Sequence, residues 1–329
     1  MTDPFRSFPS LPPLPPLPPI PGFGPIAPQG DDLPAATGMA GDTMCLASSD
    51  AMPELPSPKP SGKYKDIEEL AAKTRTDANT WVAGRPLSEG KNAHKTNTVD
   101  QMKEALKSDE NFFECDLRPE IDPPHRPECR HDEGSESGDN LLLSEWLDIG
   151  KRSGRGLKLD IKDGGAIPQI LDEVEKNGVP DERLMFNLQD ADMAKYAPEI
   201  RRRFPLATVA INPASELDGH KNDGKMQDWQ VDRMIQLAEQ AGPPTTFVVR
   251  FDLLTDEAIA RLKEHGTVSV WNAMGEPAVS DPAKVAQQLR DRGVDGVVDI
   301  RETPDLLDKV EVGVDYAKNK ARDFFHDHF

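Results

Sequence analysis

The sequence predicts a (β/α)8 TIM barrel that follows a disordered, proline-rich N-terminal tail. From residue 63 onward, short apolar segments of strand length alternate with longer amphipathic segments of helical period. Eight such strand-helix pairs follow one another, and residues 63–329 have the length of a barrel of about 250 residues. A doubly wound open sheet is the competing architecture, but no Gly-x-Gly-x-x-Gly follows the first expected strand.

The tail comprises residues 1–62. Residues 1–60 hold 16 of the 31 prolines, concentrated in Leu-Pro-Pro repeats between Leu11 and Pro21. Proline lacks a backbone donor and favours extended polyproline II structure, so we expect no packed core here. The tail is either simply disordered, a docking segment for a protein partner with an aromatic-lined groove, or a secretion or delivery arm.

The barrel domain comprises residues 63–329, and its elements are expected in regular alternation. The helices before Gly178 and Gly293 end at a normal stop signal. Strands are expected at 92–94, 112–117, 157–161, 184–188, 207–211, 246–250, 267–271 and 294–299. Helices are expected at 97–107, 164–177, 192–203, 228–241, 255–264, 281–292 and 303–322.

A long polar insertion, residues 118–145, separates the second strand from its helix. It is rich in proline and contains His125 and the strand-like segment Arg130-His131-Asp132. Loops of this length are usually functional or disordered. In a barrel this loop would lie on the C-terminal face, where active sites are found.

Composition excludes several classes of partner. The formal charge of −19 argues against nucleic acid, whose phosphates need a positive surface, and against docking on anionic lipid by charge alone. An acidic chain can still bind a small phosphate ester if a metal ion and a few bases line the pocket. The hydrophobic content of 36% and the mean hydropathy of −0.60 suggest that part of the chain lies outside the core.

The three cysteines form neither a disulfide framework nor a zinc spacing. Cys115 is expected as a small buried strand residue, with a Cys115–Cys129 bridge as the alternative. No apolar stretch approaches the roughly 20 residues of a transmembrane helix, and the N-terminus lacks the pattern of a signal peptide. We therefore expect a protein that is cytoplasmic or secreted by a route independent of a signal peptide.

An apolar strand that ends in two acids, Glu114 and Asp116, is the most informative local pattern. Strand side chains alternate, so both carboxylates face one side and Cys115 faces the other. Asp160 follows at the end of the adjacent strand. Three oxygen ligands at neighbouring strand ends suit Mg²⁺ or Ca²⁺, and zinc fits less well because no cysteine pair accompanies them.

Other residues near the same face complete the expected site. His94 and His131 could share general acid and base duties, although single histidines are often structural. Lys162 could hold a phosphate oxygen or form a salt bridge, and Arg250 could clamp an anion. Trp271 could form an apolar or cation-binding wall, with core packing as the alternative.

In their order and spacing, these residues resemble the glycerophosphodiester phosphodiesterase and phospholipase-C-like barrel superfamily. That pattern has a histidine before an Asn-Thr-type helix start, Glu-x-Asp on strand two, His-Asp in the next loop, and an acid two residues before a lysine on strand three. The matching segments are Ala93-His94-Lys95-Thr96-Asn97-Thr98, Glu114-Cys115-Asp116, His131-Asp132, Asp160-Ile161-Lys162, Val270-Trp271-Asn272 and residues 293–298.

Within that superfamily the chain looks most similar to the menorin-type domain. The segments Leu143-Ser144-Glu145-Trp146-Leu147 and 156–160 suggest this, and the resemblance covers residues 90–302. Two departures concern the substrate: Lys95-Thr96 replaces the usual Arg-Gly, and Asp160 replaces the usual Glu, as in the sphingomyelinase-D branch.

The resemblance implies a metal-dependent phosphodiester hydrolase acting on a glycerophosphodiester or lysophospholipid-like substrate. The cation would lie on Glu114, Asp116 and Asp160, and His94 and His131 would transfer protons. The alternatives are a non-catalytic menorin-like binding module and a sphingomyelinase-D-like phospholipase. An exported effector is compatible with any of these activities.

Overall fold

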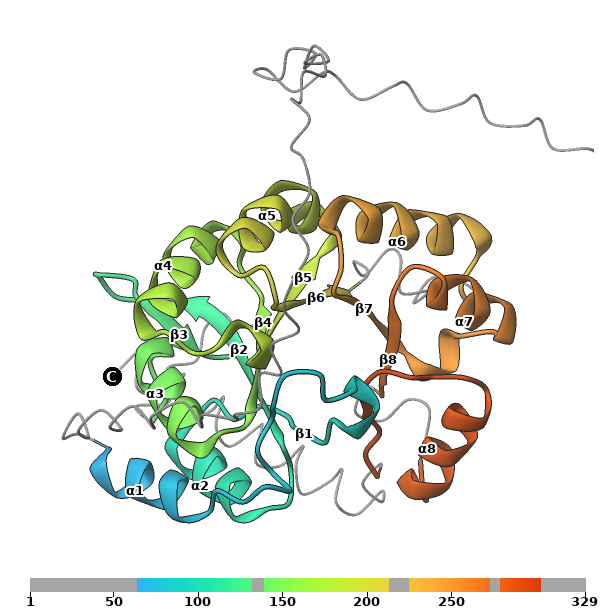
Figure 1. Cartoon of the computed structure of the whole chain (residues 1–329). Helices are drawn as coiled ribbons and strands as arrows, with labels where there is room; N and C mark the ends of the chain where they lie inside the picture. The colour runs from blue at the N-terminus through green and yellow to red at the C-terminus, as the bar shows by residue number, and fades with distance from the viewer. Residues whose placement is uncertain (1–63, 132–138, 213–224, 273–278, 303–329) are drawn as a thin grey trace, which may run out of the picture. The chain divides into compact units, whose positions relative to one another are not determined.

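A parallel β-barrel surrounded by helices forms the described part of the chain (Figure 1). The computed structural model describes residues 64–131, 139–212, 225–272 and 279–302. The expected tail (1–62) and the expected last helix (303–322) lie outside these residues. The predicted α/β TIM-barrel class is confirmed.

The strands follow chain order around the barrel, except that β3 lies beside β2 only. All neighbours along the path are parallel, and β3 is antiparallel to β2. Strands β1 and β9 are the two ends of this order, so the barrel is nearly closed. The strands are β1 (Asn92–Ala93), β2 (Phe112–Pro119), β3 (Pro127–Cys129), β4 (Gly156–Ile161), β5 (Leu184–Gln189), β6 (Thr208–Asn212), β7 (Thr245–Arg250), β8 (Thr267–Trp271) and β9 (Val298–Asp299).

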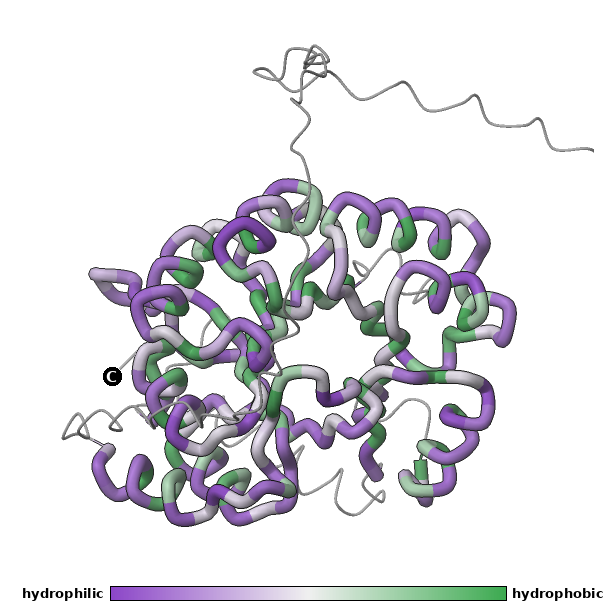
Figure 2. The backbone as a smooth tube through the Cα atoms, in the orientation of Figure 1, coloured by the Kyte–Doolittle hydropathy of each residue, from purple (hydrophilic) through white to green (hydrophobic). Residues whose placement is uncertain are grey.

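Helices cover the outside of the barrel, with their apolar sides toward the strands (Figure 2). Local sequence fixes several of their ends: Thr98 and Gln101 form a capping box before α2, and Gly178 ends α4 with φ of 70°. None of the described helices is long and apolar enough to cross a membrane. The helices are α1 (Lys65–Lys73), α2 (Val99–Lys107), α3 (Leu143–Ser153), α4 (Ile167–Asn177), α5 (Asp190–Arg203), α6 (Asp228–Ala241), α7 (Asp256–Lys263) and α8 (Pro282–Asp291).

The insertion after the second strand differs from the prediction. Strand β2 continues to Pro119 and pairs with β3, so Asp116 lies inside the strand and does not end it. Arg130 and His131 follow β3 and are not in a strand. The hairpin was not predicted because prolines are usually found in loops. Here Pro119 ends β2 and Pro127 begins β3, and at the end of a strand proline is tolerated although it lacks a backbone donor. Helix α1 was not predicted, and the helix expected after the insertion is α3, which begins at Leu143, inside the range assigned to the insertion.

The barrel is held to its helices by a large apolar core. The predicted burial of Cys115 is confirmed, and Cys129 is equally buried; both are free thiols, so the bridge between them is absent. Gly156 begins β4 against Phe112, and a Cβ at this position would lie 2.4 Å from the Phe112 ring. This close approach explains why a residue without a side chain starts the strand.

A fully buried arginine, Arg155, ties the start of the barrel together. Its Nε donates to the Glu110 carbonyl oxygen (2.7 Å), and its Nη2 donates to the Leu106 carbonyl oxygen (3.1 Å) at the end of α2. Its guanidinium also lies 4.9 Å from the centre of the Phe113 ring. The buried guanidinium thereby provides donors for carbonyl groups at the end of α2 and just after it.

Candidate functional site

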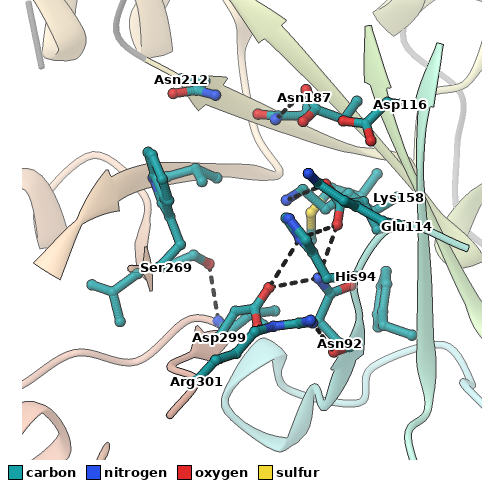
Figure 3. A pocket seen from close by; sticks show the side chains of 18 of the residues that line it. Asn92, His94, Glu114, Asp116, Lys158, Asn187, Asn212, Ser269, Asp299 and Arg301 are labelled. Atoms are coloured by element: carbon teal, nitrogen blue, oxygen red, sulfur yellow. Dashed lines mark hydrogen bonds and ion pairs between the residues drawn. The ribbon is translucent and has the colours of Figure 1, made fainter. Parts of the chain in front are cut away.

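A cavity of about 540 Å³ opens at the C-terminal ends of the barrel strands (Figure 3). Side chains from β1, β2, β4, β5, β6, β7, β8 and β9, and from the segment after β3, line it. Seven of the eight residues that the sequence predicts for the site are among them. These are His94, Glu114, Asp116, His131, Asp160, Lys162 and Trp271.

Strand alternation and register bring the three predicted acids together. Glu114 and Asp116 face the cavity from β2, whereas Cys115 between them packs in the core. On the neighbouring strand, Asp160 lies directly opposite Asp116. One carboxylate oxygen from each acid lies within 4.8 Å of the others, so the expected convergence is present.

Two lysines compensate the charge of this acidic group. Lys162 Nζ lies 3.0 Å from an Asp116 oxygen and 2.6 Å from an Asp160 oxygen, and Lys158 Nζ lies 3.7 Å from Glu114 Oε1. Burial alone would lower the pKa of the Lys162 ammonium, but the two aspartates raise it above its usual range. The salt-bridge alternative for Lys162 is therefore what the structure contains.

The pKa values of Asp160 and Glu114 shift in opposite directions. Burial raises the pKa of Asp160, and the neighbouring Glu114 and Asp116 add to this effect against the lysines. Burial would also raise the pKa of Glu114, but Lys158 and His94 hold it well below its usual range. Glu114 therefore stays negatively charged, and Asp160 is easier to protonate than Glu114.

Two asparagines orient the acids: Asn97, which was expected only as part of a helix start, and Asn187, which was not expected. Asn97 Nδ2 donates to Asp116 Oδ2 (2.9 Å), and Asn97 Oδ1 accepts from the Asp116 backbone N–H (3.0 Å). Asn187 Nδ2 donates to Asp160 Oδ1 (2.8 Å). Asn97 comes after β1 and Asn187 from the middle of β5, so only the folded barrel brings them to these carboxylates.

The donor set fits a hard divalent cation. Glu114 Oε1 and Asn187 Oδ1 are buried and accept no hydrogen bond from the described residues. Buried oxygens without donors are costly unless a ligand or ion satisfies them. Carboxylate and amide oxygens are the ligands that Mg²⁺ and Ca²⁺ prefer, and both described cysteines lie in the core, away from the cavity.

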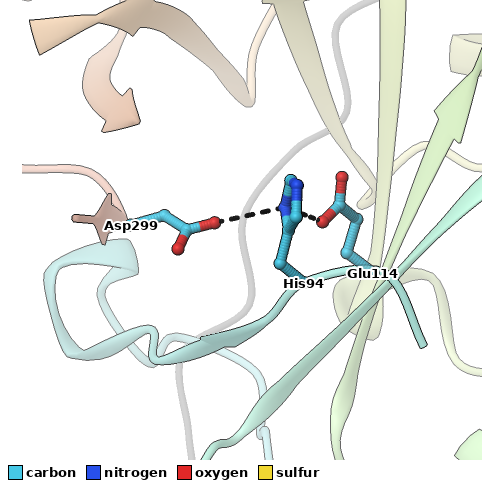
Figure 4. A group of neighbouring side chains, drawn as sticks. All are labelled: His94, Glu114 and Asp299. Atoms are coloured by element: carbon cyan, nitrogen blue, oxygen red, sulfur yellow. Dashed lines mark ion pairs between the residues drawn. The ribbon is translucent and has the colours of Figure 1, made fainter. Parts of the chain in front are cut away.

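His94 lies between two carboxylates (Figure 4). Its Nδ1 forms a short ion pair with Glu114 Oε2 and lies 3.5 Å from Asp299 Oδ2. Burial alone would lower the pKa of His94, but the neighbouring carboxylates of Asp299 and Glu114 raise it to about 9. Sequence reasoning missed Asp299, although its place at the end of the last expected strand was the same signal that singled out the other acids.

His131 reaches the cavity from the segment after β3. The Arg130 backbone N–H donates to the Asp116 carbonyl oxygen (2.7 Å), which holds this segment against β2. Arg118 Nε donates to the His131 carbonyl oxygen (2.9 Å). His131 is exposed at the cavity rim, whereas His94 is mostly buried, so the two histidines have the different environments that the sequence analysis assumed.

Of the two predicted residues at the ends of β7 and β8, Trp271 lines the cavity and Arg250 does not. Trp271 ends β8 and lines the cavity, as expected for a wall residue. Arg250 ends β7, but it is absent from the cavity lining, and its guanidinium is paired with both carboxylate oxygens of Asp252 (2.6 and 3.0 Å). The prediction that Arg250 clamps an anion in the site is therefore not supported, because a local acid two residues away engages it.

The fold and the site define a TIM-barrel domain with an acidic, histidine-containing pocket at its C-terminal face. The menorin N-terminal domain family matches residues 88–294, which is more than half of the chain, and the chain belongs to this family. No curated protein matches the sequence.

Two solved structures are similar only at a low level. One is 2,3-dimethylmalate lyase, a PEP mutase/isocitrate lyase superfamily member, with a TM-score of 0.43, 9% identity, and coverage of 78% of this chain and 87% of that chain. The other is a putative phosphonomutase from Burkholderia cenocepacia J2315, with a TM-score of 0.40, 10% identity, and coverage of 77% and 98%. This similarity is too low to transfer an activity.

Proposed function

We propose that this menorin-type barrel is a metal-dependent phosphodiester hydrolase acting on a glycerophosphodiester or lysophospholipid-like substrate. The observation on which the proposal rests is the meeting of three carboxylates and two histidines in one cavity. The order of these residues along the chain also supports a place in the glycerophosphodiester phosphodiesterase and phospholipase-C-like superfamily.

The charge of the cavity lining suits an anionic substrate, in contrast to the charge of −19 for the whole chain. Four acids and four lysine or arginine side chains are found in the described lining. The positive groups would attract a phosphodiester and meet the charge that develops on it. The acids are Glu114, Asp116, Asp160 and Asp299, and the cations are Lys95, Lys158, Lys162 and Arg301.

The acids Glu114, Asp116 and Asp160 would hold the divalent cation, Mg²⁺ or Ca²⁺. When bound, such an ion supplies Lewis-acid polarisation of a phosphoryl oxygen. Lys162 is close enough to these acids to exchange a carboxylate partner for a phosphoryl oxygen. Trp271 would form the wall beside the group attached to the phosphate.

The two histidines would divide the proton transfers. His94 is held in its charged form at neutral pH by its two carboxylates, so it is suited to donate a proton to the leaving oxygen. His131, which is exposed and lines the cavity, would accept the proton of the attacking hydroxyl. Proton transfers of this kind contribute about 10²- to 10⁴-fold each.

Direct turnover measurements test the proposal. Purified protein is incubated with a panel of glycerophosphodiesters and lysophospholipids in Mg²⁺, in Ca²⁺ and in EDTA, and the released head group is quantified. We expect metal-dependent turnover that falls at least about 100-fold in Glu114→Gln. The matched control is Glu257→Gln, an exposed acid on α7, which should retain full activity. Full activity in EDTA, or in Glu114→Gln, would contradict the proposal.

A binding module without turnover is the second candidate. It is favoured by the two lysines, whose ion pairs compensate the charge of the acidic group. Isothermal calorimetry that detects Mg²⁺ binding, with no turnover across the panel, would support this candidate over the enzyme.

For the tail, residues 1–62, we propose a role in partner docking or export that is separate from the site. A chain lacking these residues should retain its turnover or its metal affinity. Unchanged export of the shortened chain would contradict a delivery role.

A further inference from the structure

The first and last barrel strands are joined at the cavity by side chains. Strands β1 and β9 end the strand order, and Asn92 Nδ2 on β1 donates to Asp299 Oδ2 on β9 (2.8 Å). Arg301 extends the junction, because its Nε donates to Asp299 Oδ1 (3.1 Å) and its Nη2 to the Asn92 carbonyl oxygen (3.4 Å). Figure 3 shows Asp299 held in this way beneath His94.

The carboxylates of Asp299 and Glu114 both face the same ring nitrogen of His94. Both carboxylates contact Nδ1, and Asn92 Nδ2 lies between them, 2.8 Å from Asp299 and 3.5 Å from Glu114. Two negatively charged carboxylates that face one ring nitrogen favour a proton on that nitrogen, so Nδ1 is the nitrogen that bears the N–H. Nδ1 is buried, whereas 30% of the side chain is exposed, so the edge of the ring that faces the cavity is the one containing Nε2.

The two carboxylates are not equivalent. Glu114 belongs both to this group and to the group with Asp116 and Asp160, whereas Asp299 belongs only to the first. A cation bound by Glu114 would withdraw electron density from that carboxylate and weaken it as an acceptor. Asp299, anchored by Asn92 and Arg301, would still accept from Nδ1.

We propose that Asp299 is a positioning residue for His94. It keeps His94 Nδ1 as a donor and turns Nε2 toward the substrate, while Glu114 binds the cation. This inference rests on the proposed function for the catalytic part of the role. It also makes the junction of the first and last strands part of the site, because the same carboxylate joins the barrel ends and orients the histidine.

The test uses the full-length Asp299→Asn variant, in which an amide of the same shape retains an acceptor for Asn92 but loses the charge that faces His94. We expect kcat to fall by about 100-fold, with KM and the calorimetric Mg²⁺ affinity within about twofold of wild type. The proton resonance of His94 Nδ1–H, assigned by its loss in His94→Gln and recorded at one pH, should move upfield. The matched control is Asp291→Asn, an exposed aspartate on α8, which should change none of these values.

Three outcomes would overturn the inference. Unchanged kcat with an unmoved His94 resonance would show that Asp299 only closes the barrel. A tenfold or larger loss of Mg²⁺ affinity would make Asp299 a metal ligand together with His94 and Glu114. A moved resonance with kcat unchanged would show contact without a catalytic consequence.

Two further measurements keep the test decisive. If the wild-type chain hydrolyses no phosphodiester, the proposed function fails, but the resonance in Asp299→Asn still tests the positioning of His94. If Asp299→Asn does not fold, Asn92→Ser removes one anchor of Asp299 and leaves the carboxylate in place. It should shift the same resonance upfield and lower kcat in the same direction, and an unmoved resonance there would refute the proposal.

Discussion

Removing the charge of Lys162 should destabilise the metal-free protein and make its stability depend on a divalent cation. The Lys162 ammonium lies between two aspartates, 3.0 Å from Asp116 and 2.6 Å from Asp160. Methionine at this position keeps the length of the apolar stem and removes the charge. Two buried carboxylates would then face each other without the ammonium that lies between them, and only Lys158 would remain to compensate the acidic group.

The magnitude follows from the burial of the ion pairs. Removing one partner of a buried pair costs about 3–5 kcal/mol. Because the Lys162 side chain is 23% exposed, we take the lower end, about 3 kcal/mol of unfolding free energy. A divalent cation at 100 times its Kd returns about 2.7 kcal/mol, and the variant should bind it more tightly than wild type because no ammonium competes.

The sign of the pH dependence adds a second readout. Burial and neighbouring acids already raise the pKa of Asp160, and loss of Lys162 should raise it further. A carboxyl group with a raised folded-state pKa destabilises the fold above that pKa and stops doing so once it is protonated. The stability difference between Lys162→Met and wild type should therefore shrink as the pH falls from 8 toward 5.

Urea unfolding followed by circular dichroism, in EDTA and in Mg²⁺, measures all of these effects. Lys107→Met, at an exposed position in the last turn of α2, is the matched control, and we expect it to cost only about 0.3 kcal/mol. The reasoning is refuted if Lys162→Met in EDTA at pH 8 is as stable as wild type. It is also refuted if Mg²⁺ stabilises the variant no more than it stabilises wild type.

Three further predictions concern the core and the histidine. Arg155→Met should lower the unfolding free energy by about 4 kcal/mol, since buried carbonyl groups lose a charged donor; a loss below about 1 kcal/mol in urea unfolding would contradict this. Burial raises the pKa of the Cys115 and Cys129 thiols, so neither should react with Ellman's reagent until the protein unfolds, in a variant whose third cysteine is serine. The pKa of His94 is raised from 6.5 to about 9, so its contribution, about 2 kcal/mol after allowance for its partial exposure, should be complete below pH 6.5 and lost as the pH rises through 9. His94→Gln should remove this part of the pH dependence in metal-free protein, and an unchanged pH profile would argue against the ion pairs.

The sequence predicted most of the barrel because strand and helix periods are local properties. The apolar segments around Glu114 and Asp160 have the length and alternation of strands, and neighbouring parallel strands necessarily bring their carboxyl ends together. The hairpin of β2 and β3 was not predicted because it forms through the pairing of its two strands, whereas its proline-rich composition is typical of a loop. The start of helix α3 was missed for a related reason, since Leu143 lies within the residues assigned to the insertion.

The sequence by itself determined the barrel class, the shared face of Glu114 and Asp116, and the acidic chemistry of the site. These follow from side-chain alternation and from the parallel arrangement of successive strands, which act over a few residues at a time. Only the tertiary structure decided that Asp299 meets His94, because that contact forms where the first and last strands come together, and Asn92 and Asp299 are 207 residues apart in the chain. It also decided that Lys162 compensates the acids and that Arg250 pairs with Asp252, because the partner of a long charged side chain depends on which carboxylate the fold brings within reach.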